Sequence, residues 1–388
     1  MSSDISIIIV ISIIIVISPL ISKKTHIPTV PIEIALGSLA ASFHLLSHNY
    51  IFELVAELGF LYLMFLAGLE VDIRKLFKVP KEILTKGSFY VILLYVLSTA
   101  IALYFDLGLI FIVIMPLISI GLLAALKKEY GDQPWIELSI TVGLIGEIVS
   151  IVLLTIVSAK MEFGITPEFY KTMIILALLF VGLVVLYKFL HHLVWWYPEI
   201  KQNLMPKYDH TEQDIRLSMT TFFLLIAMML YLNLEVAFGA FIAGVFIRTF
   251  FEHKKELPTK LEHFGFGWLV PIFFISIGAS FDIDSIMIDG LIMTAVGITT
   301  AMISIRVISS FLLIKELGNS ILKTILFGLS HSMPLTLLIA VATLAFHNRS
   351  IDQFHYYAFI LSAILEVLIG MISIRILAKI EQKKRLKS

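Results

Sequence analysis

The chain has 388 residues, of which 59% are hydrophobic and 15% charged, and its mean hydropathy is +0.97, which excludes a water-soluble domain of this length. Basic and acidic residues number 29 each, so the net charge of zero does not supply the basic face that nucleic-acid binding requires. The absence of cysteine excludes disulfides, thiolate nucleophiles and cysteine metal sites.

Apolar runs separated by short polar breaks predict an all-α integral membrane protein of about thirteen transmembrane helices. The first run, 5–22, has no basic residue before it and is followed by Lys23 and Lys24, a layout opposite to that of a signal peptide. We therefore expect a retained first helix with the N-terminus outside. The predicted helices are 5–22, 30–47, 52–69, 86–105, 107–126, 135–159, 168–190, 213–230, 234–250, 264–280, 287–314, 319–345 and 354–380.

The basic residues give the predicted orientation. With the N-terminus outside, only Lys160, Lys171 and Arg349 fall in outside segments, and Arg306 falls within a span. The remaining lysines and arginines lie in inside segments, as the positive-inside rule requires. This distribution predicts that the C-terminus lies inside, in the cytoplasm. The membrane that we expect is a bacterial inner membrane. No soluble regulatory domain is expected, because the longest break, 195–216, carries no motif.

Two prolines interrupt apolar runs at corresponding places. Pro116 lies midway along the fifth predicted helix and Pro334 midway along the twelfth, and each removes a backbone donor, so each helix is either kinked or unwound. The offset of seven helices predicts two repeats of opposite orientation, 5–159 and 213–380, joined by a linker helix at 168–190. Matched interrupted helices are typical of a transporter binding site.

Glu147 is the candidate ion- and proton-binding residue. It lies about 12 residues into the sixth predicted helix, or roughly 18 Å of rise, near the bilayer midplane. A carboxylate in wholly apolar surroundings is costly unless it has a function or a partner. Such a group can hold either a proton or a small cation, and Gly143 and Gly146 leave room for close backbone approach or for a local opening of the helix. The alternative is a structural, hydrogen-bonded glutamate.

Two further charges lie within predicted spans. Arg306 in the eleventh helix stays protonated, so it cannot carry the proton, but it can compensate a carboxylate or a broken-helix dipole. The alternative is an arginine that snorkels to the inner interface. Glu366, midway along the last helix, is either a second functional acid or the partner of a polar group. The sequence leaves open whether Arg306 pairs with Glu147 or with Glu366.

Polar residues at the two breaks complete the candidate site. Ser119, in the first break, offers its hydroxyl either to an ion or to freed backbone groups. His331 and Ser332 lie in the second break, where His331 is either a titratable group or a hydrogen-bond partner. Metal-ligand clusters, phosphate-binding loops and nucleophile–base pairs are absent from the sequence. We therefore expect neither an enzyme nor a cofactor, and no metal beyond a transported monovalent cation.

Three segments resemble monovalent cation:proton antiporters, in the branch that includes the Kef-type potassium transporters. Phe60 to Asp72 (FLYLMFLAGLEVD) is similar to a GLE-D signature of that family. Phe238 to Gly244 (FGAFIAG) resembles its LGAFLAG segment, and Val270 to Asp282 (VPIFFISIGASFD) resembles its LFFI-VGMS-D segment. Their order and spacing fit across nearly the whole chain.

The resemblance implies the sodium/proton antiporter fold, with a dimerising panel and a core of two crossed, unwound helices. It places Glu147 at the ion-binding position and Arg306 at the basic position before the second break. It also implies a homodimer in which the core moves against the scaffold. The family usually carries Asp at the ion position, often after Asp, Asn or Gln, whereas this chain has Gly146 and Glu147.

We therefore expect a secondary antiporter that exchanges Na⁺ or K⁺ for protons. Because one carboxylate that swaps one proton for one monovalent cation moves no net charge, the exchange is expected to be electroneutral. Two alternatives stay open on the sequence alone. One is an uncoupled, channel-like K⁺ efflux protein, and the other is a non-transporting membrane component on the same scaffold.

Overall fold

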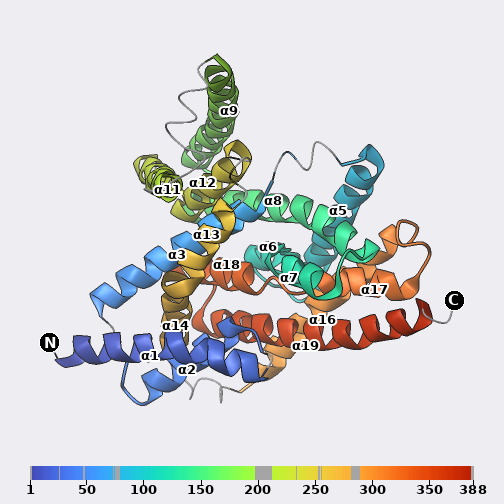
Figure 1. The fold of residues 1–388 in the computed structure, drawn as a ribbon, viewed down its shortest axis with the longest axis horizontal. Coiled ribbons are helices and arrows are strands. Elements are labelled where there is room, and N and C mark those ends of the chain that lie inside the picture. Colours follow the sequence, from blue (N-terminus) through green and yellow to red (C-terminus); the bar gives the residue numbers. More distant parts are fainter. Residues whose placement is uncertain are drawn as a thin grey trace. The chain divides into compact units, whose positions relative to one another are not determined.

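The computed structural model describes residues 2–25, 27–46, 49–72, 74, 79–196, 212–232, 234–251, 254, 256–280 and 289–385 (Figure 1). Within these ranges the chain is helical and contains no β-strand. The chain divides into two compact units. The first comprises 1–57, 74–154 and 271–388, and the second comprises 58–73 and 155–270.

The helices of the first unit come from both halves of the sequence. They are α1 (Ser2–Thr25), α2 (Thr29–Ser42), α5 (Lys81–Tyr104), α6 (Leu109–Ile114), α7 (Gly121–Tyr130), α16 (Leu291–Ser310), the 3₁₀ turn η2 (Phe311–Leu313), α17 (Ile321–Ser330), α18 (Leu335–His347) and α19 (Gln353–Arg385). The unit also contains the start of α3 (Tyr50–Glu70) and most of α8 (Pro134–Phe163) and α14 (Val270–Ser280).

The second unit is built from the middle of the chain. It contains α9 (Pro167–Trp196), α11 (Gln213–Tyr231), α12 (Val236–Phe250), α13 (Leu257–Phe264) and the π-helical turn η1 (Gly265–Leu269), with the end of α3 and the end of α8. Most of the predicted break 195–216 lies outside the described residues.

Each predicted range contains helical residues, and the two ranges interrupted by proline, 107–126 and 319–345, each hold two helices. The predicted helix 107–126 is two helices, α6 and α7, separated by a non-helical segment at 115–120. The predicted helix 264–280 begins earlier, at Leu257, and passes through η1 before α14.

Within the described residues, eight helices are long and apolar enough to cross a membrane, or nine if the bent pair α17 and α18 forms one span. Two shorter apolar helices, α2 and α12, fall below that length. The count of about thirteen spans, and the outside position of the N-terminus, therefore stay predictions.

Large apolar side chains are exposed along many of these helices. Ile8 in α1 is 65% exposed, Leu103 in α5 is 76% exposed and Met293 in α16 is 78% exposed. A water-soluble protein rarely leaves so much continuous apolar surface uncovered, whereas lipid tails solvate it at no cost. The helical faces that carry these residues are therefore suited to contact with the bilayer.

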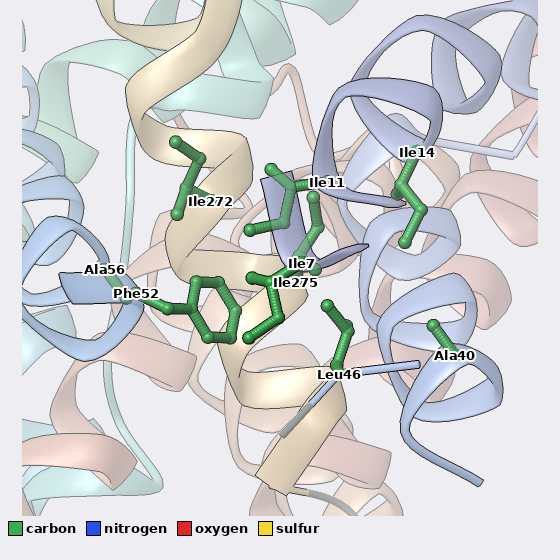
Figure 2. Close-up of a cluster of buried hydrophobic side chains, with 9 residues drawn as sticks. All are labelled: Ile7, Ile11, Ile14, Ala40, Leu46, Phe52, Ala56, Ile272 and Ile275. Atoms are coloured by element: carbon green, nitrogen blue, oxygen red, sulfur yellow. The ribbon is translucent and has the colours of Figure 1, made fainter. Parts of the chain in front are cut away.

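A core in the first unit joins the N-terminal helices to α14. Ile7, Ile11 and Ile14 recur at helical spacing on one face of α1, so their side chains meet the same neighbours. Figure 2 shows them beside side chains of α14 and of residues 40–56. The buried members of this cluster are Ile7, Ile11, Ile14, Ala40, Leu46, Phe52, Ala56, Ile272 and Ile275. Packing of this kind fixes α14 against α1 and α2.

Close helix crossings in each unit depend on paired glycines. In the first unit, a Cβ on Gly37 of α2 would lie 2.4 Å from the Ile275 carbonyl oxygen, and one on Gly278 of α14 would lie 2.1 Å from that of Ile34. In the second unit, Gly68 of α3 and Gly244 of α12 cross in the same way. Since no larger residue fits at such backbone separations, these glycines set the distance between the helices.

Candidate ion site at the broken helices

The first break exposes backbone groups within an apolar bundle. Residues 115–120 are non-helical between α6 and α7, and Pro116, Leu117 and Ser119 within them are buried. Pro116 has no backbone N–H to give to a helix, which favours unwinding at this position. Backbone carbonyls freed in this way need partners from side chains, an ion or water. The segment can therefore present oxygen atoms to a cation.

Glu147 is fully buried on α8, the helix that packs against this break. A Cβ on Gly146 would lie 2.5 Å from Ile118 Cδ1, and one on Gly143 would lie 3.2 Å from Leu123 Cδ1. The two glycines therefore leave room for side chains of the first broken helix to lie close to α8. This packing places α8, which carries Glu147, against the Ile118 side chain of the unwound segment.

Arg306 is fully buried and binds three groups. Its Nη1 donates to Glu366 Oε1 at 3.0 Å and to the Met302 carbonyl at 2.7 Å. Its Nη2 donates to the carbonyl of Leu117 at 2.6 Å, inside the first break. The snorkelling alternative is therefore wrong for Arg306, and its ion-pair partner is Glu366. The arginine joins α16, α19 and the unwound segment.

The second break lies between α17 and α18, which are bent by 44° relative to each other. Pro334 precedes α18 as its N-cap residue, and Ser332 Oγ donates to the Gly328 carbonyl at 3.2 Å. His331 follows the last residue of α17 and is fully buried. Its Nδ1 lies 3.0 Å from Tyr90 Oη and its Nε2 lies 2.9 Å from the carbonyl oxygen of Ser139 in α8. His331 is thus a hydrogen-bond partner, one of the two roles left open by the sequence.

The structure brings together candidates that the sequence could only place separately. Arg306 contacts both Glu366 and the first break, while His331 connects the second break to the Glu147 helix. Sequence reasoning missed Tyr90 and Ser139. A tyrosine within an apolar helix is a usable signal, since its hydroxyl needs a partner when buried, but the partner itself cannot be read from spacing.

Comparison with known proteins places this arrangement in a family. The profile of the transmembrane sodium/hydrogen exchanger family matches residues 9–380, nearly the whole chain. The chain belongs to this family. The assignment to cation:proton antiporters made from the three sequence segments is confirmed, whereas the nearness to the Kef-type branch stays a prediction.

Relatives of this exchanger chain carry matching names. It is 26% identical over 383 residues to the "Putative Na(+)/H(+) antiporter YjbQ" of Bacillus subtilis, covering 93% of this chain but only 60% of that protein. It is also 26% identical over 332 residues to the "Probable Na(+)/H(+) antiporter 3" of Methanocaldococcus jannaschii, covering 81% of each chain. The exchanger chain thus spans less than two thirds of the Bacillus relative.

The fold of the exchanger chain matches that of a solved antiporter. The sodium proton antiporter MjNhaP1 from Methanocaldococcus jannaschii superposes with a TM-score of 0.69 at 15% identity, over 98% of this chain and 99% of that chain. The predicted all-α antiporter fold is therefore confirmed at the level of architecture.

Proposed function

We propose that this chain is a secondary antiporter that exchanges Na⁺ for protons, with Glu147 as the carboxylate that holds each ion in turn. The observation that carries the proposal is the burial of Glu147 on a glycine-lined face of α8 against the unwound first broken helix. A carboxylate at such a position favours a bound cation or a proton over a bare charge. The family membership and the names of the relatives support the same reaction class.

The ion pair of Arg306 supports electroneutral exchange. The guanidinium cannot lose its proton, and its ion-pair partner is the carboxylate of Glu366. Arg306 and Glu366 together contribute no net charge. In the proposed cycle Glu147 therefore carries one proton in one direction and one monovalent cation in the other, and no net charge crosses the membrane.

The repeats belong to the same proposal. The two broken helices, α6–α7 and α17–α18, provide the matched interruptions expected of two oppositely oriented repeats, 5–159 and 213–380, with 168–190 between them. Assembly as a homodimer, a cytoplasmic C-terminus and residence in the bacterial inner membrane follow from the family resemblance and the charge distribution. They stay predictions.

The test is ion-driven proton movement in proteoliposomes that are acidified inside, with the membrane potential clamped. Na⁺, K⁺ or Li⁺ is added to vesicles that hold the wild type, Glu147→Gln or the matched control Glu137→Gln. Glu137 lies on the same helix, but its side chain is 60% exposed. We expect alkalinisation with Na⁺ in the wild type and in the control variant, and none in Glu147→Gln.

Other outcomes would select a different function. Alkalinisation by K⁺ but not by Na⁺ would show that the transported cation is K⁺. A K⁺ current with no pH change would favour the uncoupled channel. No response from folded, inserted protein would favour the non-transporting component. Proton movement driven by the potential alone would refute electroneutrality.

A further inference from the structure

The two polar contacts of His331 select one neutral tautomer of its imidazole. Nε2 faces the Ser139 carbonyl oxygen at 2.9 Å, and a carbonyl can only accept, so Nε2 carries the hydrogen. Nδ1 then accepts the hydrogen of the Tyr90 hydroxyl, at 3.0 Å. Both nitrogens are satisfied in this one neutral tautomer. A protonated Nδ1 would instead force the Tyr90 hydroxyl to turn its hydrogen away from the imidazole.

The ring is also held by its neighbours. The Phe327 ring of α17 packs edge-on to it, with centroids 4.6 Å apart, and the Tyr90 ring of α5 lies 5.5 Å away. Tyr90 and Phe327 themselves pack edge to face at 5.2 Å. Next to the histidine, Ser330 Oγ lies 2.8 Å from Ser139 Oγ. The end of α17 is therefore joined to α5 by ring packing and to α8 by two polar contacts.

His331 meets α8 on the face that carries Glu147. Ser139, Gly143 and Glu147 are spaced by four residues, so they follow one another along one side of the helix. A Cβ on Gly143 would lie 3.6 Å from His331 Nε2, so the missing side chain leaves room for the imidazole. From Ser139 to Glu147 the helix rises by about 12 Å. A contact at Ser139 therefore fixes how far this face of α8 is rotated.

We propose that His331 is a positioning residue that holds the second broken helix against the Glu147 face of α8 as a permanently neutral imidazole. This role rests on the proposed function of Glu147 but adds a residue from the other break. The first break is fixed to its surroundings by Arg306, and the second by His331. Losing the His331 contacts lets α8 rotate and moves the Glu147 carboxylate away from its cation-binding position.

The transport test compares graded changes at this contact. His331→Leu removes both hydrogen bonds, Tyr90→Phe removes one and keeps the ring, and His331→Gln offers a donor and an acceptor in their place. We expect His331→Leu to raise the half-saturating Na⁺ concentration about tenfold with a maximal rate within about twofold of wild type, and Tyr90→Phe to raise it about threefold. His331→Gln should restore it to within about twofold of wild type. The control His347→Leu changes an exposed histidine of α18 and should have no effect.

A second measurement does not depend on transport. ¹⁵N-histidine spectra of the protein in bilayers should contain a neutral, Nε2-protonated signal that disappears in His331→Gln. A doubly protonated or Nδ1-protonated signal for His331 would overturn the proposal. The proposal would also be overturned if His331→Leu left the half-saturating Na⁺ concentration unchanged. The same holds if His331→Gln raised that concentration as much as His331→Leu does. If exchange survives Glu147→Gln, the proposed function fails while the spectra still report on His331.

Discussion

The buried pair of Arg306 and Glu366 gives the sharpest stability prediction. The two side chains are fully buried and their closest atoms, Nη1 and Oε1, are 3.0 Å apart. At an effective dielectric constant of about 20, their attraction is about 5 kcal/mol. Removing one partner of a buried pair leaves the other charge uncompensated and typically costs about 3–5 kcal/mol. We therefore expect Glu366→Gln alone to destabilise the protein by about 3–5 kcal/mol.

The expected change is large enough to measure as a melting temperature. An unfolding entropy of about 2.1 cal/mol/K per residue converts that cost to a fall in Tm of about 4–6 °C for a chain of this length. Thermal unfolding in detergent, followed by the fraction that stays monodisperse, is the assay. The double variant Arg306→Gln with Glu366→Gln removes both charges but also the Arg306 bonds to the Met302 and Leu117 carbonyls, so it should regain only part of the loss. With the single variant Arg306→Gln completing the cycle, we expect a coupling energy of about 3 kcal/mol.

A neutral pair on the same two helices supplies the control. α16 and α19 pack along each other, and Thr299 Oγ1 lies 3.0 Å from Ser362 Oγ. The cycle of Thr299→Ala and Ser362→Ala should give a coupling of about 1 kcal/mol, as for one hydrogen bond between uncharged groups. The reasoning would be refuted if Glu366→Gln melted within 1 °C or so of wild type, or if the charged pair coupled no more strongly than the neutral one.

Two further predictions concern packing and a helix cap. Gly278→Ala places a Cβ 2.1 Å from the Ile34 carbonyl oxygen, so it should lower the free energy of unfolding by about 3 kcal/mol or more, measured by thermal unfolding. The control Gly297→Ala, whose Cβ would have nothing within 4 Å, should be neutral or stabilising. Asp352 precedes α19, and its Oδ1 accepts the backbone N–H of His355 at 2.8 Å, so Asp352→Ala should cost about 1 kcal/mol near neutral pH. Partial burial raises the pKa of the Asp352 carboxyl, but the hydrogen bonds from His355 outweigh it and hold that pKa below its usual value. The stabilisation by Asp352 is therefore present above a pH of about 3.9 and is lost as the pH falls through the lowered pKa. The free energies of unfolding of wild type and Asp352→Ala should then converge in acid. A difference between them that stayed constant with pH would contradict this.

The positions of the helices and breaks could be predicted because local composition determines them. An apolar run in lipid has no alternative to a helix, and a proline removes a backbone donor wherever it occurs. Pro116 and Pro334 therefore located both interruptions. The width of the first break could not be read in the same way. Within residues 115–120 the Leu117 carbonyl accepts a hydrogen bond from Arg306, and that contact joins residues far apart in the sequence.

The partners of the buried polar groups could not be predicted. Whether Arg306 meets Glu147 or Glu366 depends on the rotation and register of α16 against α19, which packing sets. The contact of His331 with Ser139 likewise depends on the rotation and register of neighbouring helices, which the sequence does not give. Glu33 gives a third case, because this buried acid of α2 accepts a hydrogen bond from Ser18 Oγ of α1 at 3.4 Å and no motif in the sequence marks it.

The glycine crossings give a separate argument for the proposed repeats. A shift of seven predicted helices relates the second (α2) to the ninth (α12) and the third (α3) to the tenth (α14). A crossing of α2 with α14 in one repeat therefore corresponds to a crossing of α12 with α3 in the other. Among the glycines that the structure describes, Gly37 with Gly278 and Gly68 with Gly244 are the pairs that bring backbones into contact at these crossings. In the sequence, Gly68 and Gly278 each precede an aspartate by four residues. The same device at positions related by this shift is what two repeats of opposite orientation would contain, so the crossings agree with the proposed repeats.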